Sequence, residues 1–362
     1  SYVVVWTSLN QDGSGEGVYA RRFDSTGAAL TPELQVHQSP LNDQQWARVA
    51  SAADGTFVVT WTSNHGANVE DIYFRRFAAD GTALTGETLV NTSTTGVQKN
   101  SVIGMNQTTG DFVIVWQGNG TQTGEIDADG IFGQRFDGSG AAIGGEFRVN
   151  ANTANIQYDA AVSVNDSGAF VVTWEDSAGF HFQRFDNAAT EQGGQVTVDG
   201  SISAGNGAVA MHSDDSFVVT WRKTVLDEGV YARRYDSSGT PLSSEAVVNT
   251  STVFNQTNPS IAMDSSGDYI IVWEGFGSGD NSGVFGRKYD SSGTALTGEF
   301  LVNNTTTNTQ SQASVAILDI DNYVVVWSGE GAGDIDGVFA RQFSDIPPVL
   351  DLDADNSSGA SG

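Results

Sequence analysis

The stretch that decides the fold is Phe57-Val-Val-Thr-Trp61, an aromatic residue followed by three β-branched residues and a tryptophan. The same order of an aromatic residue, three aliphatic or Thr residues and Trp returns along the whole chain. Its seven copies end at Trp6, Trp61, Trp116, Trp174, Trp221, Trp273 and Trp327. Successive copies lie 55, 55, 58, 47, 52 and 54 residues apart, a regularity that composition alone does not produce. Because β-branched and aromatic residues in a row favour a strand, we expect seven equivalent strands.

Each repeat contains four short segments. A small aliphatic segment such as Ser260-Ile-Ala-Met263 precedes the Trp strand, and a segment such as Val230-Tyr-Ala-Arg-Arg-Tyr235 follows it. The fourth segment reads Glu299-Phe-Leu-Val-Asn303 after a tight turn such as Asp290-Ser-Ser-Gly293, in which Gly can take a positive φ. No helical period of useful length occurs. Four antiparallel strands repeated about every 50 residues predict a β-propeller blade.

Both faces of the Trp strand are apolar. Phe57, Val59 and Trp61 point to one side of the strand, and Val58 and Thr60 point to the other. A blade with two apolar faces cannot bury them alone, whereas a ring of blades lets each blade cover its neighbours. We therefore predict an all-β, seven-bladed β-propeller of four-stranded antiparallel blades over residues 1–344, with an open β-solenoid as the alternative.

The first and last blades are predicted to be incomplete. Repeat one begins at its Trp strand, and repeat seven stops after its third segment, Val338-Phe-Ala-Arg-Gln-Phe343. The parent chain is therefore expected to begin roughly 20–30 residues earlier, which is less than one repeat period. The tail, residues 345–362, changes to a Pro-, Asp- and Ser-rich composition and is predicted to be a linker and the start of a following domain.

Composition excludes several classes of function. The chain has 16 Lys and Arg against 44 Asp and Glu, a net charge of −28 that repels nucleic acid and anionic lipid. It has no Cys, so disulfides, thiolate metal sites and Cys nucleophiles are absent, and its 4 His are too scattered to predict a zinc site. Apolar runs of about five residues are too short to span a membrane.

The full repeat resembles one seen in very large secreted bacterial proteins of the RTX and cadherin-like adhesin type. The likeness is carried by the Trp motif, by the Val/Ile-Phe/Tyr-Ala/Gly-Arg-Arg-Phe-Asp strand and by Gly298-Glu-Phe-Leu-Val-Asn303. The tail from Pro348 is similar to the opening of immunoglobulin-like modules in such proteins. The resemblance implies an extracellular, calcium-rich setting, adjacent domains in the same long chain and a binding or spacer role. The nonapeptide calcium repeats of the RTX class do not occur here, so the resemblance supplies no calcium ligands.

Two acidic loops have spacing that suits a hard cation. Glu125-x-Asp127-x-Asp129-Gly130 places alternate carboxylates on one side of a turn, and Gly333-Asp334-Ile-Asp336-Gly337 is a shorter version. Ca²⁺ takes about six to eight oxygen ligands, so backbone carbonyls and water would have to complete either site. The candidate Ca²⁺ ligands are therefore Glu125, Asp127, Asp129, Asp334 and Asp336. Solvated acidic turns are the alternative, and a calcium-dependent rise in melting temperature distinguishes the two.

Two aromatic residues fall outside the motif positions. Trp46 lies in the first strand of blade two, near the central channel of the predicted ring, and Phe254 lies in the connection between blades five and six. Either residue can stack on a sugar ring, while core filling is the alternative. Trp46 and Phe254 are therefore the candidate ligand-binding residues.

Two recurring polar features are predicted to serve the framework. The Arg pairs of the third segment, such as Arg75-Arg76 and Arg233-Arg234, return with most blades, which favours structural hydrogen bonds over anion binding. A polar residue also recurs after the fourth segment and predicts hydrogen bonds between blades. Its members are Gln44, Gln98, Gln157, Gln256 and Gln310, with Asn206 standing in.

No catalytic constellation can be identified from the residues. Acid pairs occur throughout the chain, so none can be singled out as a glycosidase pair, and no nucleophile motif accompanies a His. We therefore expect a non-enzymatic binding, adhesion or spacer module, extracellular or on a bacterial cell surface. Its expected partner is a cell-surface glycan or protein, bound through the acidic loops. The alternative is a polysaccharide-active enzyme, a lyase or a glycosidase, with its site at the central channel.

Overall fold

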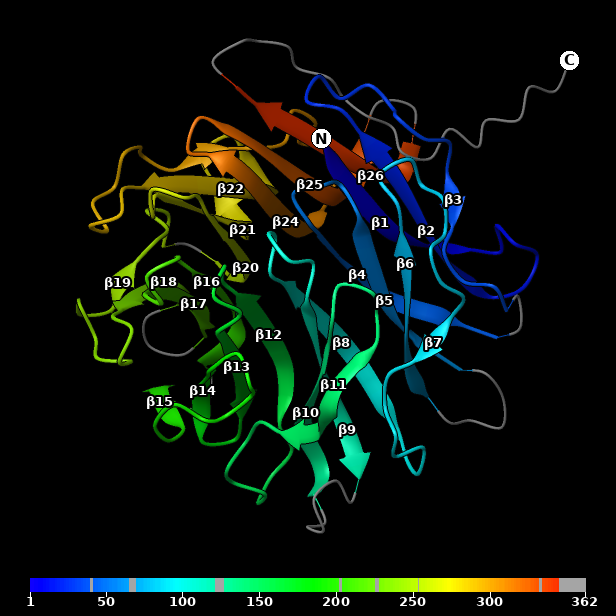
Figure 1. Cartoon of the computed structure of the whole chain (residues 1–362). Coiled ribbons are helices and arrows are strands. Elements are labelled where there is room, and N and C mark those ends of the chain that lie inside the picture. The colour runs from blue at the N-terminus through cyan, green and yellow to red at the C-terminus, as the bar shows by residue number, and fades with distance from the viewer. Residues whose placement is uncertain are drawn as a thin grey trace, which may run out of the picture. The chain divides into compact units, whose positions relative to one another are not determined.

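The computed structural model describes residues 1–39, 42–64, 70–120, 127–201, 204–224, 228–252, 254–331 and 334–344. Within these residues 26 β-strands form seven antiparallel sheets, one around each Trp motif (Figure 1). The all-β, seven-bladed β-propeller predicted from the repeat is confirmed. In the described part of the chain no helix is long and apolar enough to cross a membrane.

The strands that carry the Trp motif are buried on both sides. In β5 every residue from Phe57 to Ser63 is buried, as the alternation of two apolar faces predicts. The Trp strands of the seven blades are β1 (Tyr2–Leu9), β5 (Phe57–Ser63), β9 (Phe112–Gly120), β13 (Phe170–Asp176), β17 (Phe217–Lys223), β21 (Tyr269–Gly277) and β25 (Asn322–Gly331).

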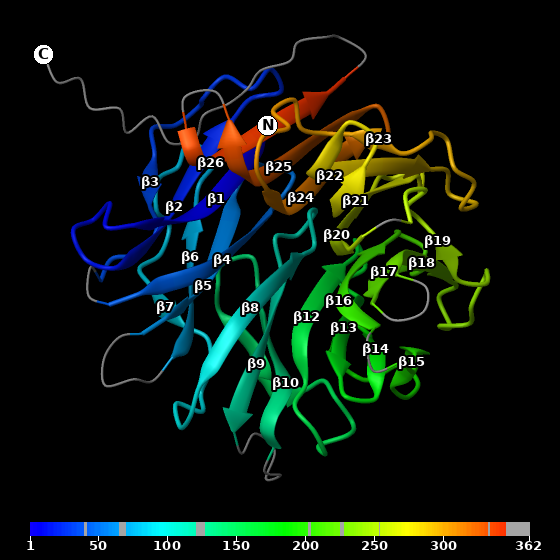
Figure 2. The same ribbon diagram turned by 180° about the vertical axis from the view of Figure 1, so that it is seen from behind.

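A small-residue strand precedes the Trp strand in blades two to seven, and we call it the inner strand. These strands are β4 (Gln44–Ser51), β8 (Gln98–Met105), β12 (Tyr158–Val164), β16 (Ala204–Met211), β20 (Gln256–Met263) and β24 (Gln310–Asp319). Inner strands β4, β8, β12 and β16 contact one another in sequence and lie side by side (Figure 2). Their small side chains let neighbouring backbones approach closely.

The third and fourth strands complete each blade. The third strands are β2 (Glu16–Phe23), β6 (Asp71–Phe77), β10 (Asp127–Phe136), β14 (Gly179–Phe185), β18 (Gly229–Tyr235), β22 (Asp280–Tyr289) and β26 (Asp334–Phe343). The fourth strands are short: β3 (Leu34–Gln35), β7 (Thr88–Leu89), β11 (Ala142–Arg148), β15 (Val196–Asp199), β19 (Ala246–Val247) and β23 (Phe300–Leu301).

The end blades differ from the others as predicted. Among the residues that the structure describes, the sheet β1-β2-β3 has no inner strand and the sheet β24-β25-β26 has no fourth strand, whereas the other five sheets have four strands each. Residues 345–362, predicted to be a linker, lie outside the described residues. The chain divides into two compact units, which we call unit 1 (Ser1–Phe217 and Tyr235–Thr240) and unit 2 (Val218–Arg234 and Pro241–Gly362).

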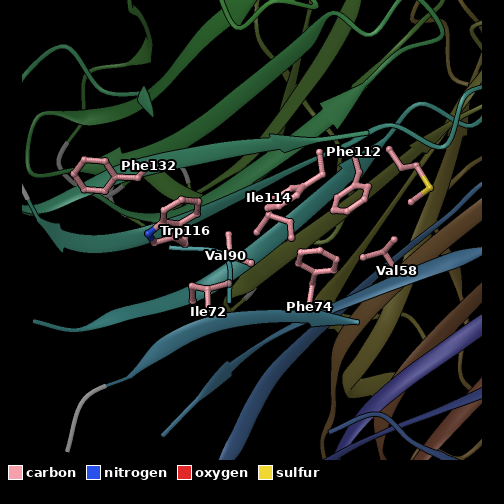
Figure 3. Close-up of a cluster of buried hydrophobic side chains, with 10 residues drawn as sticks. Val58, Ile72, Phe74, Val90, Phe112, Ile114, Trp116 and Phe132 are labelled. Carbon is pink, nitrogen blue, oxygen red and sulfur yellow. The ribbon is translucent and has the colours of Figure 1, made fainter. Parts of the chain in front are cut away.

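The hydrophobic core lies between neighbouring blades. In Figure 3, Val58 and Phe74 of blade two face Phe112 and Trp116 of blade three, and all four side chains are at most 2 % exposed. Apolar surface removed from water stabilises by about 25 cal/mol per Å². Each blade therefore depends on the next one for its stability.

Arginine side chains join neighbouring blades, as predicted. Arg75 of blade two donates from Nη1 to Val36 O of blade one at 2.8 Å, and Arg76 donates from Nη1 to Ser139 O of blade three at 2.8 Å. Equivalent bonds run from Arg287 Nη1 to Val248 O (3.0 Å) and from Arg341 Nη1 to Val302 O (2.7 Å). These guanidinium groups serve the framework.

In four blades the recurring Gln has a different role from the one predicted. Gln44 Oε1 accepts a hydrogen bond from Trp61 Nε1 at 3.0 Å, within one blade. Equivalent bonds join Gln98 to Trp116 (3.1 Å), Gln256 to Trp273 (2.9 Å) and Gln310 to Trp327 (3.1 Å). In these four blades the predicted bond between blades is therefore wrong, whereas Gln157 before β12 accepts a hydrogen bond from Asn150 Nδ2 of blade three at 3.1 Å. In blade five the position is taken by Ala204 and not by Asn206.

Candidate functional site

A pocket of about 700 Å³ lies at one end of blade six, and all of its lining residues belong to unit 2. It is built by the ends of β20, β21, β22 and β24 and by the segments that lead into β18 and β20. Its lining residues are Glu228, Phe254, Asn255, Thr257, Glu274, Gly275, Phe276, Asn281, Ser282, Thr309 and Gln310.

Two aromatic rings form one wall of the pocket. Phe254 is 66 % exposed, and its ring centroid lies 5.1 Å from that of Phe276 at an interplanar angle of 59°. Phe254 also has a φ of +61°, a conformation that bulky residues rarely adopt. The residue predicted from sequence as a ligand contact therefore lines a pocket and does not fill the core.

Glu274 forms a second wall and is mostly buried. It follows Trp273 on β21, so its side chain points away from the tryptophan and toward blade seven. Its Oε1 accepts hydrogen bonds from the backbone N–H groups of Gln312 and of Ala313, the latter at 3.3 Å, and its Oε2 accepts one from Asn258 Nδ2 at 2.9 Å. Burial raises the pKa of Glu274, and the hydrogen bonds only partly oppose this.

Blade four has a carboxylate at the same position, which lines no part of this pocket. Glu175 follows Trp174 on β13 and is 6 % exposed. An added Cβ at Gly205, on the inner strand of the next blade, would lie 1.0 Å from Glu175 Oε2, so the carboxylate lies against the backbone there. Glu175 is therefore the natural comparison for Glu274.

The remaining lining is polar. Glu228 is exposed and lies directly before β18, and Asn281 is exposed at the start of β22. The backbone N–H of Ser282 donates to Asp280 Oδ1 at 3.0 Å, and Asn303 Nδ2 donates to Asp280 Oδ2 at 2.6 Å, which fixes this corner. The pocket thus combines an exposed aromatic face, two carboxylates and several amide and hydroxyl groups, a set suited to a ligand rich in hydroxyls.

Trp46, the other predicted ligand contact, lies in unit 1. It occupies the third position of β4 and is 41 % exposed, whereas every other Trp of the chain is 9 % exposed or less. Trp46 therefore does not fill the core either. The structure places Trp46 and Phe254 in separate units.

The first predicted calcium loop falls partly outside the described residues. Glu125 lies outside them, and of Asp127 only the backbone, at the start of β10, is described. Asp129 Oδ1 accepts a hydrogen bond from Gln117 Nε2 at 3.1 Å.

The structure describes both acids of the second predicted calcium loop, Asp334 and Asp336. Asp334 Oδ1 accepts a hydrogen bond from the backbone N–H of Asp336 at 2.9 Å, within the loop. Within the described ranges no three His, Cys, Asp or Glu side chains are grouped so as to hold a metal ion. The calcium site stays a prediction.

Comparison with known proteins identifies the fold. No family model and no curated protein sequence matches the chain. An ulvan lyase, described as a new family of polysaccharide lyase, has a TM-score of 0.56 and 8% identity over 94% of this chain and 90% of its own. The α-L-arabinanase of Penicillium chrysogenum has a TM-score of 0.50 and 11% identity, covering 83% and 93%. A sialidase of Streptococcus pneumoniae has a TM-score of 0.54 and 6% identity, covering 83% and 68%.

These neighbours correct the prediction that the chain is not an enzyme. Each of the three is named as an enzyme that acts on a glycan. Identities of 6% to 11% show a shared fold and nothing finer, so the lack of a recognisable motif in the sequence is no ground for excluding catalysis. The fold is one that glycan-active enzymes also have, which keeps the alternative of a polysaccharide-active enzyme open.

Proposed function

We propose that this protein hydrolyses a polysaccharide and that the blade-six pocket is its active site. The observation that carries the proposal is the presence of the exposed ring of Phe254 and the carboxylates of Glu228 and Glu274 in one pocket. An aromatic face packs against the C–H face of a sugar ring, while carboxylates and amides bind its hydroxyls.

The lining favours hydrolysis over elimination. Elimination from a uronic acid requires a base together with a group that neutralises the sugar carboxylate in the transition state. Among the described residues that line the pocket there are two acids but no Lys, Arg, His or Tyr. Two carboxyl groups are the set that glycoside hydrolysis uses.

The two carboxyl groups are suited to different steps. Glu274, whose pKa burial raises, retains its proton more readily and donates it to the glycosidic oxygen as the bond between that oxygen and the sugar carbon breaks. A water molecule adds to the sugar carbon and loses its proton to the exposed carboxylate of Glu228. One water is consumed for each bond cleaved, and both carboxyl groups return to their starting states once protons exchange with solvent.

A polysaccharide substrate also implies where the protein acts and what it binds. A polysaccharide of a cell wall or extracellular matrix lies outside the cell, which supports the extracellular or cell-surface location implied by the resemblance. The partner is then a glycan, bound as substrate.

The test is the release of reducing ends from neutral polysaccharides (arabinan, galactan and laminarin) and from polygalacturonate. We expect the wild-type chain to cleave one of the neutral polymers, and Glu274→Gln and Glu228→Gln to lower the rate by about 10²- to 10⁴-fold. Phe254→Ala should raise KM. Glu175→Gln, at the equivalent position in blade four, is the matched control and should leave the rate unchanged.

Two outcomes would overturn the proposal. If the wild type releases no reducing ends from any polymer in the panel, the protein is not the proposed hydrolase, even if it binds one of these polymers. Full activity in Glu274→Gln would remove that residue from catalysis. Because a Gln side chain keeps an oxygen acceptor for the N–H of Gln312, this variant should melt near the wild-type temperature, and that measurement excludes misfolding as the cause of a lost rate.

A further inference from the structure

The inner strands share an unusual backbone conformation near their start. One residue near the start of each inner strand, the third in five strands and the second in β12, has a positive φ, and in most blades the strand pairing shifts register there. The residues and their φ angles are Trp46 (53°), Asn100 (55°), Asp159 (52°), Asn206 (48°), Asn258 (50°) and Gln312 (57°). Asn and Asp tolerate this region because their short polar side chains can hydrogen-bond locally, whereas Trp is an outlier in it.

Trp46 gains no burial from this strained position. It is 41 % exposed, although the fold buries each of the other seven Trp side chains. Backbone strain that persists without a packing gain is typical of functional sites. Blade two therefore holds a large aromatic face in solvent where the other blades hold amides or a carboxylate.

Arg48 lies two residues after Trp46 on β4. Both residues are exposed, and Ala47 between them is buried. In the described structure Arg48 makes one hydrogen bond, from Nη1 to Ala47 O at 3.0 Å, which leaves most of its five N–H donors available. Desolvation by the surrounding protein nevertheless lowers the pKa of Arg48, and the Asp159 carboxylate opposes that shift. Arg48 is thus exposed, and the Asp159 carboxylate is near enough to interact with it electrostatically.

Asp159 supplies an acceptor on the same set of strands. It lies on β12, at the position equivalent to Trp46, and Asn206 Nδ2 of β16 is 3.4 Å from its Oδ2. The strands β4, β8, β12 and β16 lie side by side within unit 1 (Figure 2). Among the ion pairs of the described residues none joins Arg48 to Asp159 within 4.0 Å, so each keeps capacity for a ligand.

We propose that Trp46, Arg48 and Asp159 form a second saccharide-binding site, which takes an uncharged sugar unit of the polysaccharide. This proposal rests on the proposed function and names its substrate class. The indole stacks on the sugar ring, Arg48 donates to hydroxyl or ring oxygens, and Asp159 accepts from hydroxyls. The site holds one cation and one anion, and the chain carries a net charge of −28, so nothing offsets the repulsion of a polyanion.

The fluorescence of Trp46 can be used to detect binding at this site. As the one exposed tryptophan among the 8, all of which lie in described residues, it should dominate any change of intrinsic fluorescence on binding. The full chain is titrated with arabinan, galactan, laminarin and polygalacturonate. We expect at least one neutral polymer to change the fluorescence and to bind more tightly than polygalacturonate.

The variant Trp46→Asn separates binding from folding. It places at position 46 the residue that blades three, five and six already have there (Asn100, Asn206 and Asn258), so it should melt at or above the wild-type temperature. We expect it to weaken binding of the neutral polymer by about tenfold or more in calorimetry, and Arg48→Met to do the same.

The outcomes distinguish this site from the blade-six pocket. If Trp46→Asn binds and cleaves the neutral polymer like the wild type while Glu274→Gln is inactive, the second site is refuted and the proposed function stands. Tighter binding of polygalacturonate than of every neutral polymer refutes the substrate class. If the wild type neither binds nor cleaves any of these polymers, both proposals fail.

Discussion

At the scale of single residues, the Trp motif depends on one hydrogen bond in addition to burial. In four blades the indole N–H donates to the Gln that begins the same blade. Blade four is an exception, because Gln157 Oε1 accepts from Asn150 Nδ2 at 3.1 Å and the buried Trp174 Nε1 has no partner among the described residues. Trp174 therefore serves as an internal control for how much the indole hydrogen bond contributes to stability.

We predict that Trp116→Phe destabilises the protein more than Trp174→Phe, by about 1–2 kcal/mol. Both changes remove the same volume from a fully buried site. Trp116→Phe also leaves the buried Gln98 Oε1 without its donor, whereas Trp174→Phe removes a donor that has no acceptor. Urea unfolding of the two variants measures the difference, and equal losses would show that the indole hydrogen bond contributes nothing.

The candidate site illustrates what sequence can and cannot reveal about single residues. Trp46 and Phe254 could be identified because they interrupt a regular repeat. Glu228 and Glu274 could not, because they are two of 44 acids and lie in different blades. Only two Trp strands follow the Trp with Glu, but that feature marks Glu175 as well as Glu274, and Glu175 lines no part of this pocket.

At the scale of strands, Glu274 joins β21 of blade six to β24 of blade seven. Its carboxylate accepts from two consecutive backbone N–H groups of β24, at the point where the positive φ of Gln312 turns them outward. The same residue that we assign as general acid is therefore also a contact between blades. Its ionisation should affect both stability and activity.

We predict that the wild type loses stability relative to Glu274→Gln as the pH rises above 4.5, the ordinary pKa of a Glu carboxyl. Burial raises the pKa of Glu274 above its ordinary value of 4.5, so the folded state prefers the protonated form. The stabilisation is full below the pKa of the unfolded chain and is lost as the pH rises through the folded pKa. Urea midpoints across this range measure it, with the exposed Glu228→Gln as control.

The rate of polysaccharide cleavage should fall over the same pH range, because a general acid must be protonated. A pH-independent difference in stability between wild type and Glu274→Gln would contradict the raised pKa.

The strands themselves follow from the repeat, but their cross-links do not. The Arg pairs were predicted as framework residues because they recur, and Arg75, Arg287 and Arg341 confirm it. The Gln series recurs equally well, yet its bonds to Trp run within blades, and Gln157 bonds instead to Asn150 of the preceding blade. Recurrence shows that a residue serves every blade, and it does not show whether the partner lies in the same blade or in the next one.

At the scale of the whole molecule, the fold could be predicted because the sequence contains seven Trp strands, each with two apolar faces that must be buried. A Trp strand buried on both faces needs a neighbour on each side, and the cores between blades meet that need. The function could not be predicted in the same way. A propeller places its chemistry in connections and strand ends, which differ from blade to blade and therefore leave no repeated pattern.

A crystal structure of Glu274→Gln with an oligosaccharide of the polymer that the wild type cleaves would show whether the blade-six pocket is the active site. We expect a sugar ring stacked on Phe254, with the glycosidic oxygen within hydrogen-bond distance of the side chain at position 274 and Glu228 on the opposite side of the ring. An oligosaccharide bound elsewhere on the molecule, with the blade-six pocket holding only solvent, would contradict it.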